Sequence, residues 1–189
     1  MILAAGNSSR MGKPKQLLSY NGKTFLDIAI TEALKTNFRP VVIVLGAYAE
    51  EIKNHCSNPQ VHYCINENWH EGMSSSIKVG LKNIIDNYTE NIIIAVADQV
   101  HLTSEILNAL KVELSSSNKG IVTASYAGIS GTPVLFSRKY FQELLNLAGQ
   151  SGAKKIIDAN VEDSATISFD QGVIDIDTPA DYNDLINNK

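Results

Sequence analysis

The chain contains 189 residues, of which 44% are hydrophobic, and this length and composition are typical of one globular domain of ordinary size. Its 16 lysines and arginines are outnumbered by 20 aspartates and glutamates, and the resulting net charge of −4 argues against a protein that binds nucleic acid through a basic surface. No apolar stretch approaches the roughly 18 to 20 residues that cross a bilayer, and no signal-peptide core follows the start, so we expect a soluble cytoplasmic protein without a membrane association.

The first half of the chain alternates between strand and helix patterns. Residues 1–5 predict a short first strand; since only they precede a glycine-rich turn, either the strand is abbreviated or residues precede Met1 in the natural chain. Apolar residues at spacings of three and four predict a helix over 25–34. A β-branched run at 41–45 predicts a strand buried on both faces of a parallel sheet, and a second helical pattern follows at 77–85.

The same alternation continues in the second half. Residues 92–97 and 121–124 are rich in β-branched side chains and predict two more buried strands. Between them, the apolar spacing predicts a helix that begins near Glu105, with Thr103 or Ser104 as its N-cap.

Two weaker elements complete the pattern. Residues 131–136, with Pro133 near their start, predict a shorter strand that lies at an edge of the sheet or runs antiparallel, and Pro179 suits the first turn of a last helix through Ile186. Alternating strands and helices of these lengths imply right-handed βαβ crossovers. Because no linker, internal repeat or charge block divides the chain, we expect one α/β domain over residues 1–189, with three layers and a mostly parallel sheet that contains one antiparallel strand.

The two cysteines, Cys56 and Cys64, are too few for a disulfide framework and lack the spacing of a redox motif. Together with His62 and His70 they could form a tetrahedral zinc set. We favour the simpler interpretation of reduced, buried thiols and surface histidines.

The most informative segment is the glycine-rich turn at residues 6–15, which follows the first strand. A P-loop is excluded, because five residues separate Gly6 from Gly12 and Pro14 stands where a Ser or Thr should follow the lysine. The dinucleotide fingerprint is excluded as well, because its glycines are closer together and Pro14 would interrupt its helix. Another kind of phosphate-binding loop remains.

The composition of this turn suits a triphosphate. Small residues from Gly6 to Ser9 allow main-chain N–H groups and hydroxyls to approach phosphate oxygens closely, and Arg10 and Lys15 supply positive charge. The alternative is an ordinary solvated turn whose basic residues lie on the surface. The density of suitable residues favours phosphate binding.

These residues also carry a resemblance. The pattern Leu3-Ala4-Ala5-Gly6-x-Ser8-Ser9-Arg10-Met11-Gly12-x-x-Lys15 resembles the signature of the nucleotidyltransferases that build the dinucleotide forms of the molybdenum cofactor. The Ala-Ala-Gly form is similar to the cytidylyltransferase branch, whereas the guanylyltransferase branch usually carries Ala-Gly-Gly. Further segments match in the family's order, and they are Gly72 to Ile77, Ala97 to Gln99, Gly131 to Phe136, Gly149 to Lys154, and Asp175 to Pro179.

The resemblance implies a Rossmann-like nucleotidyltransferase fold and a magnesium-dependent transfer of CMP from CTP to molybdopterin, with release of pyrophosphate. It implies Lys15 at the α-phosphate and Arg10 on the β- and γ-phosphates as catalytic cations, and Mg²⁺ held by Asp98 and Asp177. The nucleotide-binding residues it implies are Leu3, Ala4, Ala5, Gly6, Asn7, Ser8, Ser9, Gly72, Ser75, Ser76 and Asp98. A molybdoenzyme or its maturation chaperone would receive the product.

Each of these residues has a structural alternative. Asp98 could be a helix-capping or turn aspartate, and Asp177 could be the N-cap ahead of Pro179. Asp175 lies on the same side of an extended strand as Asp177 and could be the metal ligand in its place. The serines at 74–76 could form a capping box, although three of them exceed what capping needs.

Three departures from the family pattern leave the acceptor open. Val100 stands where the family usually has Pro, Gln150 replaces an Asp, and Lys154 replaces an Arg that would recognise planar groups through its fork. The alternatives are therefore a guanylyltransferase, transfer to another phosphorylated acceptor, or a noncatalytic nucleotide-binding protein that delivers a cofactor. A dinucleotide-dependent oxidoreductase is disfavoured by the glycine spacing.

Overall fold

The computed structural model describes residues 1–150, 152–174 and 176–187. Its centre is a seven-stranded sheet in the order β5-β4-β1-β6-β8-β7-β9, and a two-stranded hairpin pairs β2 with β3. The strands are β1 (Ile2–Ala4), β2 (Ser19–Tyr20), β3 (Lys23–Thr24), β4 (Val42–Leu45), β5 (His62–Ile65), β6 (Asn91–Val96), β7 (Ile121–Tyr126), β8 (Ile129–Ser137) and β9 (Ser164–Ser168).

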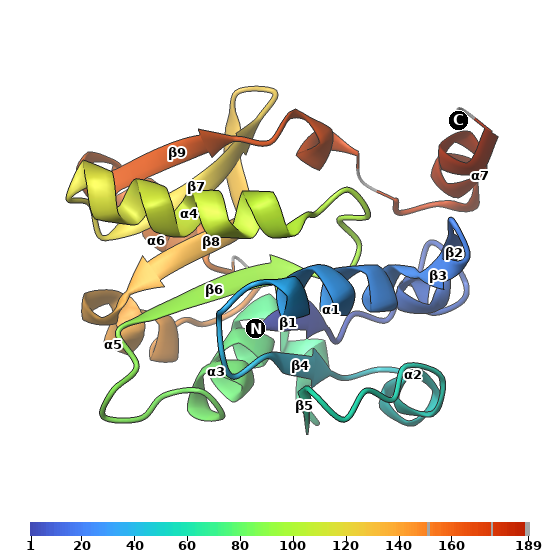
Figure 1. Cartoon of the computed structure of the whole chain (residues 1–189). Coiled ribbons are helices and arrows are strands. Elements are labelled where there is room, and N and C mark those ends of the chain that lie inside the picture. The colour runs from blue at the N-terminus through green and yellow to red at the C-terminus, as the bar shows by residue number, and fades with distance from the viewer. Residues whose placement is uncertain (151, 175, 188–189) are drawn as a thin grey trace.

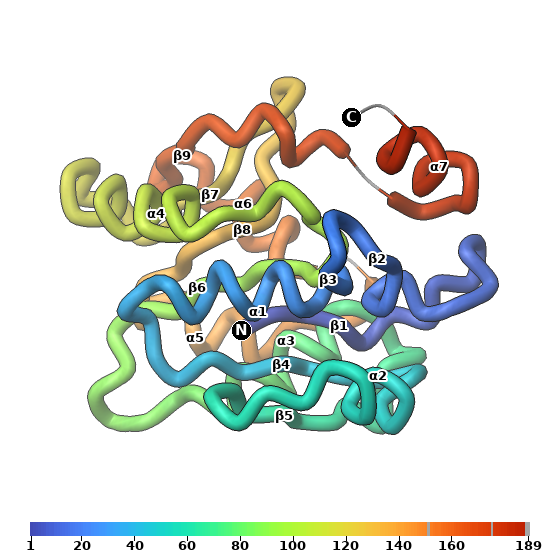
Figure 2. The backbone as a smooth tube through the Cα atoms, turned by 45° about the vertical axis from the view of Figure 1, so that its right-hand side comes forward, coloured from blue at the N-terminus to red at the C-terminus, as the bar shows by residue number. Residues whose placement is uncertain are grey.

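Helices cover both faces of this sheet (Figures 1 and 2). The α-helices are α1 (Phe25–Lys35), α2 (Ala49–His55), α3 (Met73–Lys82), α4 (Ser104–Ser117), α5 (Phe141–Leu145), α6 (Lys154–Ala159) and α7 (Pro179–Asn187). Short 3₁₀ turns lie at η1 (Lys15–Leu17), η2 (Trp69–Glu71), η3 (Arg138–Tyr140), η4 (Val161–Asp163) and η5 (Asp170–Val173).

Adjacent residues of one strand show how the layers form. Val44 of β4 packs in a core cluster with Ile77 of α3 and with residues of α5 and α6, whereas its neighbour Ile43 packs with Leu26 of α1 on the other face. Successive side chains of a strand point to opposite faces, so a continuous apolar run is buried on both sides. The predicted α/β fold with three layers and a mostly parallel sheet is confirmed.

Threonine N-caps fix where helices α1 and α4 begin. Thr24 caps α1, because its hydroxyl accepts a 3.0 Å hydrogen bond from the N–H of Asp27. Of the two predicted caps for α4, Thr103 is the one observed, and Ser104 is the first helical residue. Helix α3 ends at Lys82, short of the predicted boundary at residue 85, and a hydrogen-bonded turn carries the following isoleucines onto the core.

Of the two alternatives for residues 131–136, the antiparallel direction is confirmed and the edge position is not, and the strand is longer than predicted. Strand β8 runs antiparallel to both β6 and β7, but it lies between them and has nine residues. The pairing shifts register opposite Thr123 and Ala124, where Thr123 faces Val134 and Ala124 faces Gly131, so that Pro133 falls in the bulge. Because a bulge needs no ladder hydrogen bond there, Pro133 is tolerated inside the sheet.

The C-terminal arm, residues 176–187, packs against the N-terminal part of the chain. Ile176 is buried in a cluster with Met11, Leu18 and Phe25, and the Tyr182 hydroxyl of α7 donates a 2.8 Å hydrogen bond to the carbonyl of Ser19. Figure 1 shows α7 beside β2 and β3, away from the main sheet. The arm therefore packs against the glycine turn and the segment that follows it. Within the described ranges, no helix is long and apolar enough to cross a membrane.

Candidate functional site

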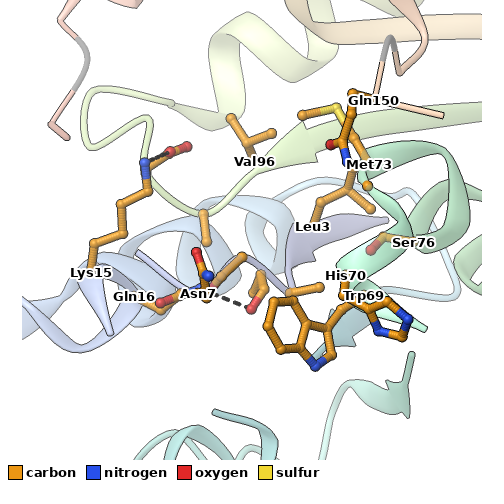
Figure 3. A pocket seen from close by; sticks show the side chains of 16 residues that line it. Leu3, Asn7, Lys15, Gln16, Trp69, His70, Met73, Ser76, Val96 and Gln150 are labelled. Carbon is orange, nitrogen blue, oxygen red and sulfur yellow. Dashed lines mark hydrogen bonds and ion pairs between the residues drawn. The ribbon is translucent and has the colours of Figure 1, made fainter. Parts of the chain in front are cut away.

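A cavity of about 470 Å³ opens at the carboxyl ends of β1 and β6 (Figure 3). This edge is where open α/β sheets bind ligands, because the strand ends leave main-chain groups and loop side chains facing one crevice. The cavity is lined by Leu3, Ala4, Ala5, Gly6, Asn7, Lys15, Gln16, Trp69, His70, Gly72, Met73, Ser76, Val96, Ala97, Asp98 and Gln150.

The glycine turn is held in shape at Ser8. This residue has a left-handed backbone (φ 49°), and its carbonyl accepts hydrogen bonds from the N–H groups of Met11 (2.9 Å) and Gly12 (3.1 Å). Its hydroxyl accepts a 3.1 Å hydrogen bond from the N–H of Lys15. In the described part of the chain, the main-chain N–H groups of Asn7, Ser8 and Ser9 have no acceptor. They are free to bind an anion.

Gln16 is a site residue that sequence reasoning missed. Its side-chain amide donates to the carbonyls of Ala4 (2.9 Å) and Gly6 (3.1 Å), and the residue is buried. Because both partners are carbonyls, the amide nitrogen must face them. Gln16 thereby fixes the first part of the glycine turn, and its position directly after Lys15 was the only signal in the sequence.

Lys15 lies between two carboxylates. Its Nζ is 2.5 Å from Oδ2 of Asp98 and 2.9 Å from Oδ1 of Asp177, and its side chain is 18% exposed. Burial lowers the pKa of Lys15, but the attraction and hydrogen bonds of Asp98 and Asp177 outweigh burial and raise it above its ordinary value. Lys15 is therefore a protonated, largely shielded cation in the lining of the cavity.

Asp177 also pairs with Arg10, whose side chain is 68% exposed. The Thr178 hydroxyl accepts a 3.2 Å hydrogen bond from the N–H of Asp181, and the Asp181 carboxylate accepts from the N–H groups of Asp177 (3.0 Å) and Thr178 (2.7 Å). Thr178 and Asp181 therefore cap α7, whereas the Asp177 carboxylate pairs with Arg10 and Lys15. Asp175, the alternative ligand, lies outside the described residues.

The segment after Asp98 is a turn anchored to β8. The Asp98 carbonyl accepts a 3.1 Å hydrogen bond from the N–H of Val100, and the Gln99 side chain donates a 2.8 Å hydrogen bond to the carbonyl of Thr132. Val100, a departure from the family pattern, is buried in the cluster that holds Ile176. Asp98 thus combines a turn position with a carboxylate that lines the cavity and contacts Lys15.

The opposite wall of the cavity is partly aromatic and was not predicted. Trp69 and His70 lie edge to face, with ring centroids 6.0 Å apart, and Figure 3 shows both rings on the same side of the cavity. Trp69 packs so closely on Gly46 that a Cβ at position 46 would lie 2.7 Å from that of Trp69. Trp69 is the sole tryptophan of the sequence and lies shortly before the predicted serine segment. These two features were the available signals for its place in the cavity wall.

The predicted segment at 72–76 divides into two environments. Gly72, with φ 105°, and Ser76 line the cavity, and the Gln150 side chain packs against Gly72. Ser75 is buried beside the cavity without lining it, and its hydroxyl lies 2.9 Å from the carbonyl of Asn68 and 2.8 Å from that of Gly72. Lys154, the last departure from the family pattern, pairs with Asp158 on the surface.

The structure brings most of the predicted residues to one cavity. Those that line it are Leu3, Ala4, Ala5, Gly6, Asn7, Lys15, Gly72, Ser76 and Asp98, and those outside its lining are Ser8, Ser9, Arg10, Ser75 and Asp177. Arg10 and Asp177 nonetheless reach Lys15 through their ion pairs.

The carboxylates of Asp98 and Asp177 suit a divalent cation. Hard oxygen ligands with room for water are what Mg²⁺ prefers, and the Lys15 ammonium that bridges these two carboxylates shows that a cation can sit between them. Within the described residues, no group of three or more His, Cys, Asp and Glu side chains could hold a metal. Among the described residues, Asp98 and Asp177 are therefore the candidate protein ligands, and substrate or solvent would complete the coordination.

Comparison with known proteins finds a matching family and several similar proteins. Residues 1–165 match the family described as MobA-like NTP transferase domain. The molybdenum cofactor cytidylyltransferase of Escherichia coli (strain K12) is 27% identical over 96% of this chain and 92% of that protein. Nicotine blue oxidoreductase of Paenarthrobacter nicotinovorans is 30% identical over 91% of this chain and 77% of that protein.

A solved structure shares the fold and contains manganese. Rv0371c of Mycobacterium tuberculosis H37Rv, in complex with manganese, is 26% identical, has a TM-score of 0.82, and covers 100% of this chain and 97% of its own.

Proposed function

The chain belongs to the family of MobA-like NTP transferase domains and is a nucleotidyltransferase, and we propose that it transfers CMP from CTP to molybdopterin with release of pyrophosphate. The observation that carries this proposal is the position of Lys15, a shielded cation between Asp98 and Asp177, beside a turn whose N–H groups at residues 7–9 have no acceptor among the described residues. This arrangement suits a triphosphate and needs no protein nucleophile.

In the proposed reaction, an oxygen of the acceptor phosphate attacks the α-phosphorus in line. A new P–O bond forms while the bond from the α-phosphorus to its bridging oxygen breaks, and pyrophosphate leaves. Lys15 would neutralise charge that develops at the α-phosphate, where partial burial strengthens its effect. Arg10, which is exposed and able to exchange its Asp177 partner for phosphate oxygens, would hold the β- and γ-phosphates.

We propose Mg²⁺ as the metal and Asp98 and Asp177 as its protein ligands. When bound, Mg²⁺ would supply additional neutralisation of the triphosphate charge. The manganese complex of the structural relative supports a divalent metal in this fold. Lys15 would then release part of its contact with the carboxylates and turn toward the phosphates.

The choice of CTP rests on the Ala4-Ala5-Gly6 form of the turn and on the cytidylyltransferase relative. The choice of molybdopterin rests on the same relative, and a molybdoenzyme or its maturation chaperone is the proposed receiver of the product. Gln150 replaces the family's carboxylate in the lining of the cavity, so it is the residue that would adapt the site to a different acceptor.

An assay of pyrophosphate release tests this proposal. Purified protein with Mg²⁺ should release pyrophosphate from CTP faster than from GTP, ATP or UTP, and only when molybdopterin is present. Faster release from another triphosphate would show that the proposed base preference is wrong. Release from CTP only with a different phosphorylated acceptor would show that the proposed acceptor is wrong. No release with any triphosphate and no bound nucleotide would overturn the proposal in favour of another function.

A further inference from the structure

Strands β6 and β8 separate before they reach the site. Their last ladder pair joins Ile94 to Val134, and beyond this pair β6 continues toward Asp98 while β8 stays paired with β7. On its other side, β6 remains paired with β1 through Ala95 and Val96. The sheet therefore holds the segment that leads to Asp98 on one side only.

One side chain spans the gap on the other side. Gln99 directly follows Asp98 and is 7% exposed, and its Nε2 donates a 2.8 Å hydrogen bond to the carbonyl of Thr132 in β8. Within the described ranges, this is the one hydrogen bond that the structure shows between residues 95–99 and 129–133. Because a carbonyl only accepts, the amide nitrogen of Gln99 must be the atom that faces it. Gln99 thus ties the turn at Asp98 to β8.

The carbonyl that Gln99 binds lies in an anchored part of β8. Thr132 falls in the bulge of this strand, and the preceding carbonyl, that of Gly131, accepts a 2.6 Å hydrogen bond from the hydroxyl of the fully buried Thr123. Side chains thus bind two successive carbonyls at the bulge, where the ladder is disrupted. Gln99 is therefore tied to a fixed point of the sheet.

The other end of the Gln99 amide is costly to the fold. Its Oε1 is buried and has no hydrogen-bond partner in the described part of the chain. A buried amide oxygen without a donor is destabilising, and an apolar side chain of similar length would avoid that cost. The glutamine is therefore better explained by the turn that it holds than by a gain in stability.

The main chain of this turn is held independently of the amide. The Gln99 carbonyl accepts a 3.0 Å hydrogen bond from the N–H of Leu102, whose side chain is buried in a core cluster. The carboxylate of the preceding Asp98 lies 2.5 Å from Nζ of Lys15. A change of the Gln99 side chain should therefore alter where this carboxylate lies without unfolding the turn.

We propose that Gln99 is a positioning residue, whose hydrogen bond to the Thr132 carbonyl holds the Asp98 carboxylate in place for Lys15 and for a divalent cation. Gln99 acts through Asp98, since it does not line the cavity. This inference rests on the proposed function only in treating Asp98 as a ligand of a divalent cation, and it requires neither CTP, molybdopterin nor turnover. Residues that orient a metal ligand in this way commonly control metal affinity.

Titration of the whole protein with Mn²⁺ in the absence of nucleotide tests this role, with the free ion followed by electron paramagnetic resonance. Gln99→Met keeps the length of the side chain but removes the donor, and it should weaken Mn²⁺ binding by about 10- to 100-fold. Gln142→Met is the matched control, because Gln142 is an exposed glutamine of α5 outside the cavity lining. It should leave Mn²⁺ affinity unchanged.

A second ligand separates a displaced carboxylate from a site that is disrupted as a whole. In calorimetric titration with inorganic tripolyphosphate and EDTA, Gln99→Met should bind this anion no more weakly than the wild type, because the glycine turn and Lys15 are unchanged. Thermal unfolding establishes that the variant is folded. Gln99→Asn, whose amide is one methylene too short to reach Thr132, should also weaken Mn²⁺ binding, and it decides the case if Gln99→Met does not fold.

The outcomes separate this inference from the proposed function. Unchanged Mn²⁺ affinity in a folded Gln99 variant, an equal loss in Gln142→Met, or no Mn²⁺ binding by the wild type would overturn the role of Gln99. Equal weakening of Mn²⁺ and tripolyphosphate binding would overturn it as well, because Gln99 would then support the site as a whole. Weaker Mn²⁺ binding by the variant, with no pyrophosphate release by the wild type from any triphosphate, would contradict the proposed reaction and support the role of Gln99.

Discussion

At the residue scale, the site depends on one ammonium shared by two carboxylates. The glycine turn indicated Lys15, because that signal is local, and the family resemblance implied Asp98, which ends an apolar run. The sequence left Asp177 with an alternative as an N-cap, and only the structure shows that Thr178 and Asp181 take that role. The pairing of Asp177 with Lys15 joins distant parts of the chain, which no local pattern encodes.

Lys15→Ala should reduce the rate of pyrophosphate release by about 100- to 1,000-fold, because a lost charge-stabilising donor typically costs about 2.7 to 4 kcal/mol in the transition state. Steady-state kinetics with the preferred triphosphate measures this. Lys13→Ala is the matched control, since Lys13 is exposed and its ammonium faces the Tyr182 ring at 5.9 Å instead of the cavity. Unchanged turnover in the Lys15 variant would refute its role.

Asp98→Asn should lose metal-dependent activity while the protein stays folded, because the amide preserves shape but removes the charge that a divalent cation needs. Titration with Mg²⁺ in the presence of nucleotide, followed by the activity assay, measures both effects. Asp158→Asn on the surface of α6 is the control for the loss of one negative charge. Undiminished metal affinity together with full turnover would show that Asp98 is no ligand.

At the element scale, the strands buried on both faces were predictable because a continuous β-branched run identifies them. Strands β5 and β9 were not predicted, since each is an edge strand with a mixed, partly exposed sequence. The interior position of β8 was missed because Pro133 is usually excluded from central strands, and the bulge that tolerates it depends on the partner strand. The aromatic wall was missed because η2 is too short to have a periodicity.

Gly46→Ala should destabilise the protein by about 1 to 3 kcal/mol, because a methyl group there would lie 2.6 Å from the carbonyl oxygen of Ala5 and 2.7 Å from Cβ of Trp69. Denaturant unfolding measures the change. Gly6→Ala should leave stability nearly unchanged, since no atom of the described residues lies within 4 Å of its added Cβ, yet it should weaken triphosphate binding at the turn. Equal stability of the two variants would contradict the close packing of Trp69 on Gly46.

At the scale of the whole molecule, the two ends of the chain build one site. The glycine turn follows β1, and the C-terminal arm returns to it through Ile176 and Tyr182 (Figures 1 and 2). A single-domain α/β fold with a cavity at the strand ends was predictable from the alternating elements. The packing of the arm on the glycine turn could not be predicted. No described residue of α7 is fully buried, and its sequence pattern therefore indicates no partner.

Ile176→Ala should loosen the arm and lower activity, because Ile176 is buried against Met11 and Phe25 and adjoins Asp177. Hydrogen exchange should rise along the arm and the glycine turn, and loss of the buried side chain should cost on the order of 2 to 5 kcal/mol in the local stability of the arm. Ile186→Ala, at an exposed position of α7, should change neither property. Identical exchange and turnover in both variants would show that the arm does not support the site.

The proposed function requires that the glycine turn and Lys15 hold the phosphates of a nucleoside triphosphate. The most direct measurement is a crystal structure with a non-hydrolysable CTP analogue and a divalent cation. We expect the triphosphate to lie along residues 6–10, with Lys15 at its α-phosphate and the metal between the phosphates and Asp98. Density for the analogue elsewhere on the molecule, with this turn empty, would contradict it.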